Sequence, residues 1–457
     1  MTLREAQNGG AGRGPLPVDA QTDPTARVRP TAREVLHDIA SGGPLRILLA
    51  VVLSLVVGSL LIVFTNEDVL DTLGYFGARP TDFFGAAGRA IGEAYAALFR
   101  GAVFNYRADS FEAAIRPLTE SLRFAGPLIA AGLGIALSFR VGMFNIGGQG
   151  QMLMGATFAG FAAANIPLPW GLHLLVAMAF GFIGAGIWAG IVGLLKAFTG
   201  AHEVIVTIML NYIAVSLITY LMRTPVLHDM ESGNNPTARA PLPTAQLPKI
   251  LGEDFSLHLG FLLCIAAVFV FWWLMERSKL GFRLRMVGLS PDAARTAGIN
   301  VKAVFVVAMV LSGLFVGLAG INQSLGRTGT FGPSIDAGIG FDAITVALLG
   351  GSRAFGVLFA GLLFGAMKAA GPSMQVQDVA PEVLIVMQGL IVLFVAAPPL
   401  VRAIFRFLPE PRVVVHTSAP RKPRAAKSAQ VASAQVDTAQ GDAAADGAAK
   451  AEKESPL

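Results

Sequence analysis

Residues 141–195 read VGMFNIGGQGQMLMGATFAGFAAANIPLPWGLHLLVAMAFGFIGAGIWAGIVGLL and contain no Asp, Glu, Lys or Arg. A helix needs only roughly 20 apolar residues to cross a bilayer, so this stretch is long enough to cross more than once. Pro167 and Pro169 mark the point at which the chain reverses between the two crossings. The stretch therefore predicts a helical protein that is embedded in a membrane.

The composition of the whole chain agrees with this interpretation. Of 457 residues, 54% are hydrophobic and only 14% are charged, against about a quarter charged in a typical soluble domain. Such a chain cannot cover itself with polar surface, so we expect its solvent to be lipid. The single cysteine, Cys264, excludes an internal disulfide, and the scattered histidines predict no metal site. We attribute the net charge of +5 to membrane orientation and expect no nucleic-acid partner.

The hydropathy pattern predicts an all-α, polytopic membrane helical bundle of about ten transmembrane segments, within a membrane domain over 45–405. Segment 340–350 is too short to span alone and is expected to be a half-helix packed within the protein. The polar extension 1–44 and the Ala-rich tail 406–457 are expected to be disordered. The predicted spans are 45–64, 124–139, 146–164, 171–195, 203–222, 259–275, 303–322, 340–350, 354–371 and 383–401.

Basic residues in the connections predict the orientation, because Lys and Arg are retained on the cytoplasmic side. Loop 276–302 carries six of them against Glu276 and Asp292, which places this loop and both termini in the cytoplasm of a cell with the protein in its inner (plasma) membrane. Loop 65–123 would then lie outside despite its arginines. Phe83 to Val103 within it could lie along the membrane surface as an amphipathic segment. The six basic residues of loop 276–302 are Arg277, Lys279, Arg283, Arg285, Arg295 and Lys302.

Small residues recur at helical spacing in three places. The pairs are Gly186 with Gly190, Gly313 with Gly317, and Gly361 with Gly365. In lipid, such pairs allow helix backbones to approach closely, although some pairs will occur by chance in a chain with 52 glycines. The pattern favours a compact bundle over isolated spans.

Amide side chains gather at 139–152, FRVGMFNIGGQGQM, where glycines interrupt the helical pattern near or within the membrane. Irregular backbone at that depth commonly lines the solute path of a transporter. The amides could bind an uncharged polar solute and an aromatic ring could stack on it; equally, the amides could cap helix ends or join neighbouring helices. The candidates for the solute path are Phe144, Asn145, Gln149, Gln151 and, in the middle of a later span, Asn211.

The cytoplasmic loop contains GLSPDAARTAGI at 288–299. Ser290 suits an N-cap, Pro291 the first helical position, Asp292 the first turn, and Gly298 the end of a helix. A loop that only connects two spans would not need these helix-start and helix-stop residues, so we expect a short helix that serves as a docking surface. The candidates for docking are Ser290, Pro291, Asp292, Arg295 and Gly298.

Motifs for catalysis are absent from the sequence. No Gly-x-x-x-x-Gly-Lys-Ser/Thr loop occurs, and no nucleophile, base and orienting group stand in a recognisable order. The chain is therefore predicted to move a solute without catalysing a reaction, and to bind no cofactor or metal itself. Asp342 and Lys368 are intramembrane charges, but acids there are too few to favour the proton relay of an ion-coupled secondary transporter.

Four separated blocks resemble the branched-chain amino acid and ribose permease family of ABC importers, and within it most closely the nucleoside-uptake branch. In that branch Asn-Ile-Gly-x-Gln/Glu-Gly-Gln is typical, as at Asn145 to Gln151. The resemblance covers roughly residues 45 to 405. The blocks are 139–156, 202–212, 281–299 with 311–320, and 340–351.

The resemblance implies a type II ABC importer-like permease fold and a set of partners. These are a cytoplasmic ATPase subunit that uses the ATP, a second and usually different permease chain, and an extracytoplasmic substrate-binding lipoprotein. It also implies that the helix at Pro291–Ala297 is the coupling helix that fits the ATPase, and that the amides at 145–151 lie near the path. A permease for ribose or another sugar, or an ion-coupled secondary transporter, remains the alternative.

Overall fold

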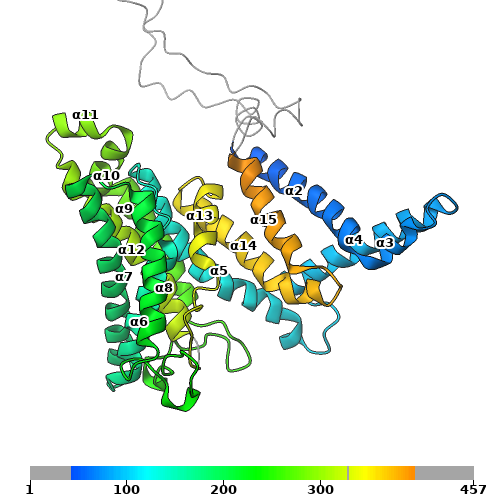
Figure 1. Cartoon of the computed structure of the whole chain (residues 1–457), viewed down its shortest axis with the longest axis horizontal. Helices are drawn as coiled ribbons and strands as arrows, with labels where there is room; N and C mark the ends of the chain where they lie inside the picture. Colours follow the sequence, from blue (N-terminus) through cyan, green and yellow to red (C-terminus); the bar gives the residue numbers. More distant parts are fainter. Residues whose placement is uncertain (1–42, 327–328, 397–457) are drawn as a thin grey trace, which may run out of the picture. The chain divides into compact units, whose positions relative to one another are not determined.

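The computed structural model describes residues 43–326 and 329–396, which belong to one compact unit. Over these residues the chain is a bundle of helices, with only isolated β-bridges in its loops (Figure 1). The expected disorder of 1–44 and 406–457 concerns residues that lie almost entirely outside this range. The helices are α2 (Gly43–Thr65), α3 (Glu67–Leu73), α4 (Pro80–Ala102), α5 (Phe111–Arg140), α6 (Gly148–Asn165), α7 (Leu172–Thr199), α8 (Glu203–Leu221), η1 (Met230–Ser232), η2 (Pro243–Ala245), α9 (Gly260–Arg277), α10 (Lys279–Leu289), α11 (Pro291–Thr296), α12 (Val301–Leu325), α13 (Ile339–Leu349), α14 (Ala354–Gln375) and α15 (Pro381–Ala396).

Each of the ten predicted spans overlaps a helix, namely α2, α5 to α9 and α12 to α15. Residues 397–401 of the last predicted span lie outside the described residues. Six of these helices are long and apolar enough to cross a membrane alone, and α2 with α3, bent by 70°, makes a seventh. The others fall short because α6 begins with polar residues and because α13 and α15 are short. The half-helix predicted at 340–350 is confirmed as α13.

The prediction that a loop extends from 65 to 123 and a short span follows it was wrong. This region holds α3, α4 and the first turns of α5, which begins at Phe111 with Ser110 as its N-cap. The charges Glu112, Arg116 and Glu120 disguised the helix because they interrupt its apolar pattern. These charged residues belong to the first turns of α5, which continue the helix beyond its apolar part, and they are not part of a loop.

Glycine contacts hold the centre of the bundle, where α12 packs against α5, α6 and α7. A Cβ on Gly313 would lie 2.6 Å from the carbonyl oxygen of Ala185, and one on Gly365 would lie 2.6 Å from the backbone nitrogen of Ala125. Gly317 and Gly361 are equally close to neighbouring helices. The predicted close approach is confirmed for these two pairs. The pair Gly186 and Gly190 meets only side-chain ends, at 3.2 and 3.3 Å.

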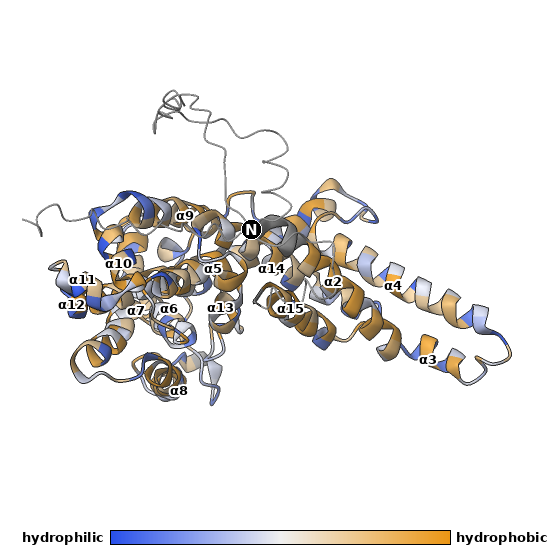
Figure 2. Cartoon of the chain, turned by 90° about the horizontal axis from the view of Figure 1, so that it is seen from above, coloured by the Kyte–Doolittle hydropathy of each residue, from blue (hydrophilic) through white to orange (hydrophobic). Residues whose placement is uncertain are grey.

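Helix α4 has hydrophobic and polar residues on opposite faces, as Figure 2 shows. Its Tyr95 donates a hydrogen bond of 2.6 Å to Leu55 O of α2, and Gly101 packs against Ala370 of α14. The amphipathic helix predicted at Phe83 to Val103 is therefore present as Pro80–Ala102. Its place on a membrane surface stays a prediction.

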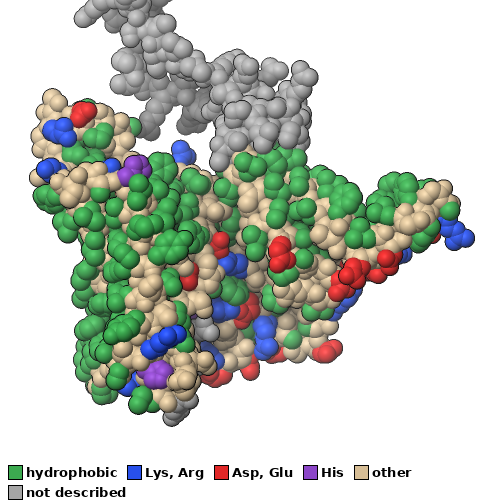
Figure 3. Space-filling model, viewed as in Figure 1, with side chains coloured by type: hydrophobic (Ala, Val, Ile, Leu, Met, Phe, Trp, Pro, Cys, Tyr) green, Lys and Arg blue, Asp and Glu red, His purple; other side chains and the backbone are tan. Residues whose placement is uncertain are grey.

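Both ends of the described chain lie at one end of the bundle. Near the start of α2, Ala50 packs with Phe394 near the end of α15, so the two helices run antiparallel. Figure 1 shows α10 and α11 at this same end. Figure 3 shows hydrophobic side chains over most of the visible face, with charged ones on α11, toward the opposite edge, along the arm at the right and in a few places at the centre. A large apolar surface of this kind is expected for a bundle whose solvent is lipid.

Candidate functional site

The segment between α5 and α6 returns into the bundle. Helix α5 ends at Arg140, Gly142 follows with φ +77°, and α6 begins at Gly148. The first turn of α6 touches Asn211, which lies two turns inside α8 and therefore about 12 Å from the start of that helix. The predicted interruption is confirmed, and it places the amides of 144–151 deep within the bundle.

Asn145 and Gln151 are fully buried and bind each other through paired amide hydrogen bonds of 3.1 and 3.0 Å. Asn145 also donates to Ser312 Oγ at 2.9 Å and accepts from the backbone of Gly147 at 2.9 Å. Ser312 Oγ in turn donates to Gly134 O at 2.6 Å. This network joins the interrupted segment to α5 and α12. It leaves these two amides little capacity for a solute, which favours the joining role over direct contact.

Asn211 has a similar role on the other side of α6. Its Oδ1 accepts from Gly150 N at 2.8 Å, and its Nδ2 donates to Ile146 O at 3.0 Å. The polar residue in the middle of α8 therefore has the neighbouring segment as its partner, one of the two outcomes that its position predicted. By satisfying these backbone groups, Asn211 allows irregular backbone to exist at this depth.

Phe144 and Gln149 are the two candidates that are not enclosed. The Phe144 ring is 58% exposed and lies 5.3 Å from the ring of Phe139. Gln149 is half-buried, and its side chain faces the carboxyl group of Asp336. The five predicted residues thus share one region, and Phe144 and Gln149 are the two among them that are not buried.

The turn before α13 is a part of this region that the sequence analysis missed. Asp336 is 4% exposed, and its Oδ2 has no hydrogen-bond partner. Ala337 and Gly338 follow with φ values of 46° and 76°. The signal available in the sequence was an acid in the stretch PSIDAGIGFD at 333–342, just before the short half-helix.

The first turns of α13 and α6 are in direct contact. Gly340 packs on the backbone of Gln149 so closely that a Cβ would overlap it. Lys368 of α14 fixes this arrangement, since its Nζ lies 2.8 Å from Asp342 Oδ2 and donates to Ala337 O at 3.1 Å. The two intramembrane charges singled out in the sequence therefore form an ion pair, and two helix N-termini meet beside Asp336.

A charged cavity opens at the end of the bundle opposite α10 and α11. Its volume is about 810 Å³. Arg116 from the first turns of α5, Glu253 from the 222–259 loop and Gln323 from the end of α12 line it, and Ala337 forms part of its wall. The cavity thus reaches the turn that holds Asp336.

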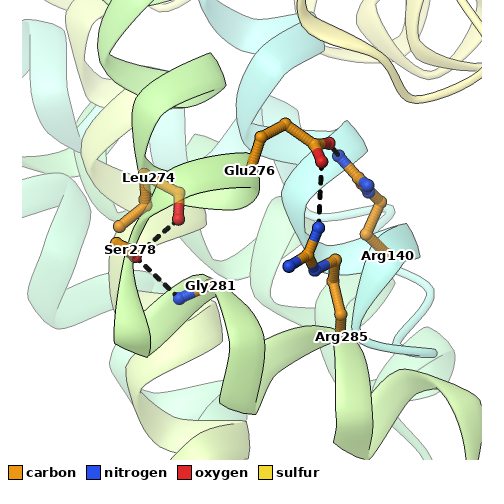
Figure 4. A network of polar contacts seen from close by, with 6 residues as sticks. All are labelled: Arg140, Leu274, Glu276, Ser278, Gly281 and Arg285. Carbon is orange, nitrogen blue, oxygen red and sulfur yellow. Dashed lines mark hydrogen bonds and ion pairs between the residues drawn. The ribbon is translucent and has the colours of Figure 1, made fainter. Parts of the chain in front are cut away.

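At the other end, polar contacts fix the start of α10 (Figure 4). Ser278 accepts from Gly281 N at 2.8 Å and donates to Leu274 O at 2.6 Å, which closes the sharp turn between α9 and α10. The Glu276 carboxylate binds Arg140 at 2.6 Å and Arg285 at 2.9 Å. The end of α5 is thereby linked to α9 and α10.

Helix α11 begins and ends where the sequence predicted. Ser290 Oγ accepts from Ala293 N at 3.3 Å, Pro291 is the first helical residue, and Gly298 has φ +79°. Asp292 and Arg295 form an exposed ion pair of 3.1 Å. The short helix is confirmed, and its Asp292 and Arg295 side chains are exposed on the surface.

An apolar bundle with broken helices at its centre and a capped helix at one end defines a polytopic membrane permease. The family "Branched-chain amino acid transport system / permease component" matches residues 118–396, and the chain belongs to this family. The family implies an ATPase and a substrate-binding protein as partners. The match begins within α5, so α2, α3 and α4 lie outside it.

Curated relatives agree with this assignment. The chain is 35% identical to the guanosine ABC transporter permease NupP of Bacillus subtilis over 324 residues, 69% of this chain and 88% of that protein. It is 32% identical to the nucleoside ABC transporter permease NupB of Lactococcus lactis, over 67% of this chain and 85% of the relative. It is 36% identical to a glucose ABC transporter permease of Haloferax volcanii, over 61% of this chain and 75% of that protein. No solved structure matches the chain.

Proposed function

We propose that this chain is the translocation subunit of an ATP-driven importer of nucleosides. It works beside a second, different permease chain, an ATPase subunit that binds and uses the ATP, and an extracytoplasmic substrate-binding lipoprotein. The chain has no ATPase site of its own. Closure of the ATPase displaces α11, and the bundle then opens alternately to the two sides of the membrane.

The observation that carries this proposal is α11. A six-residue helix with an N-cap, a proline at its first position and a glycine stop stands exposed at one end of the bundle. This helix makes the contact with the ATPase. Ser290 caps its start, Asp292 and Arg295 form its exposed ion pair, and Gly298 ends it. Because α11 is held against α5 through α10, a force on it reaches the helices that enclose the amide segment.

The charge distribution supports a cytoplasmic place for α11 and for both termini. The end that carries α10 and α11 is rich in Lys and Arg, whereas the 222–259 loop at the opposite end carries both signs about equally. Basic residues are retained on the cytoplasmic side. The charged cavity therefore opens to the exterior, where the binding protein delivers the solute.

A nucleoside is the favoured solute because two of the relatives are named as guanosine or nucleoside permeases. Phe144 can stack on a nucleobase, and Gln149 can hydrogen-bond to it without a charge. A sugar is the second candidate, since the glucose permease is 36% identical over a shorter part of the chain.

The test uses the complete transporter in proteoliposomes whose interior holds ATP and faces the ATPase subunit. Guanosine or glucose is added outside as the solute. Gly298→Pro forces φ away from +79° and disfavours the conformation of the C-cap Ala297 before it, which has φ −78° and ψ 10°. We expect solute uptake to fall by about tenfold or more while ATP hydrolysis continues.

Gly171→Pro is the matched control. Gly171 also has a positive φ, of 86°, with no atom near its Cβ position, but it lies in the turn between α6 and α7, away from α11 and from the charged cavity. Uptake by this variant should stay close to that of the wild type. Wild-type uptake by Gly298→Pro, or uptake by the wild type without ATP, would refute the proposed coupling.

A further inference from the structure

We propose that Asp336, together with Gln149, is the point at which this permease hydrogen-bonds its solute, and that it selects solutes with two adjacent hydroxyl groups. This inference rests on the proposed import function and names the chemistry of its path.

The first step is the carboxyl group itself. Asp336 is 96% buried, yet its Oδ2 has no hydrogen-bond partner. Its neighbours are the side chain of Gln149 and the backbone of Gly338. A buried polar atom without a partner costs roughly 1–3 kcal/mol, so such atoms are rare unless something else binds them. Gln149 and Gly338 therefore serve the carboxyl group in part, and its Oδ2 remains as an acceptor oxygen that no hydrogen bond within the described residues uses.

The second step is the position of this acceptor between two broken helices. The N-termini of α6 and α13 meet at Gly340 and Gln149. Discontinuous helices in transporters place their first turns at the solute, because the free backbone groups there can bind it. The hydrogen bonds of Asn145, Gln151 and Asn211 hold the start of α6 in place, and Asp336 contacts the junction through Gln149.

The third step is access. Ala337, the next residue, forms part of the wall of the 810 Å³ charged cavity. Its carbonyl accepts from Lys368, which also pairs with Asp342. The cavity thus reaches to within one residue of Asp336, and the ion pair of Lys368 with Asp342 stands beside that acceptor.

The fourth step is the chemistry of recognition. A carboxylate has two oxygens and no donor, so it suits two adjacent O–H groups, each donating to one of them. The Gln149 amide can donate and accept at the same place. A ribose ring and a hexose both carry such a pair of hydroxyls. A neutral polyol needs no counter-charge, which agrees with the internal pairing of Lys368 with Asp342.

The experiment compares guanosine with 2′,3′-dideoxyguanosine in proteoliposomes that hold the complete transporter. Asp336→Asn keeps the shape of the side chain and removes its charge. We expect it to lower guanosine uptake by roughly tenfold or more and uptake of the dideoxy analogue by less than about twofold, since only guanosine offers the hydroxyl pair. Gln149→Leu should show the same selectivity, to a smaller extent.

The matched control is Asp71→Asn, which removes an exposed acid on α3 and should change neither probe. Equal losses for both probes, or no loss for either, would overturn the inference. If wild-type transporter takes up glucose and not guanosine, the comparison uses glucose and 2,3-dideoxyglucose with the same expectations. Failure of the wild type to take up either natural solute with ATP would refute the proposed function instead.

Discussion

Gly365→Ala tests whether backbone contact between α14 and α5 holds the bundle together. The added Cβ would lie 2.6 Å from Ala125 N and 2.7 Å from Ala125 Cα, whereas contact distances start near 3.5 Å. The obstacle is backbone, which cannot rotate away, so the helices have to separate by roughly 1 Å. Overpacking of this kind costs about 1–3 kcal/mol, and the better helix propensity of Ala returns up to about 1 kcal/mol. We expect a net loss of roughly 1–2 kcal/mol.

The assay is equilibrium unfolding of the purified chain in mixed micelles with increasing SDS, followed by circular dichroism. Gly92→Ala is the control, because Gly92 lies on α4 with no atom within 4 Å of the Cβ position. That variant should gain up to about 1 kcal/mol from helix propensity alone. The two substitutions are chemically identical, so opposite signs isolate the packing term. A Gly365→Ala protein as stable as the wild type would refute the reasoning.

Two further perturbations have defined outcomes. Burial and the nearby Arg123 lower the pKa of His258 to about 4. Below about pH 6.5, His258 therefore binds a proton in the unfolded chain but stays neutral in the folded chain. The free energy of unfolding should therefore fall by up to about 3 kcal/mol between pH 6.5 and pH 4. The unfolding midpoint of His258→Gln should lack this pH dependence. A His258→Gln protein with the same pH profile as the wild type would contradict the prediction. Asn211→Ala leaves Gly150 N and Ile146 O without partners, so the free energy of unfolding should fall by about 2 kcal/mol. Asn211→Leu should lower it by as much. An unfolding midpoint equal to that of the wild type would show that water or another group replaces the amide.

The spans and α11 could be predicted because their causes are local in the sequence. Lipid requires long apolar segments, so hydropathy alone located ten helices. The Ser290, Pro291 and Gly298 pattern fixed both ends of α11 within one residue. The start of α5 was missed because its first turns are charged and do not resemble a membrane span, although Ser110 caps the helix locally. Arg116 donates to the Asp254 carbonyl at 3.3 Å, so a loop far along the chain stabilises charges that looked incompatible with a span.

The site could be predicted only in part, for a related reason. The sequence showed that 139–152 had to break its helix, and it identified the polar residues there. It could not show which amides would be used up by partners such as Ser312, which is 167 positions from Asn145. Nor could it show that Asp336 would face Gln149. Pairing of this kind depends on how α12 and α13 pack, and this is decided by contacts across the whole bundle.

The two candidate sites are joined by a short and rigid route. Gly288, just before the cap of α11, packs so closely on the Arg140 carbonyl that it has no room for a Cβ, and Gly142 lies beside it. From Gly142 the chain runs directly through Phe144 to Gln149. A displacement of α11 therefore moves the interrupted segment through backbone contacts, without any flexible side chain between. Because Gln149 rests on Gly340, the same displacement alters the junction at which Asp336 stands. Under the proposed function, coupling and solute contact thus belong to one mechanical unit, in which the ATPase would act on the path from only a few residues away.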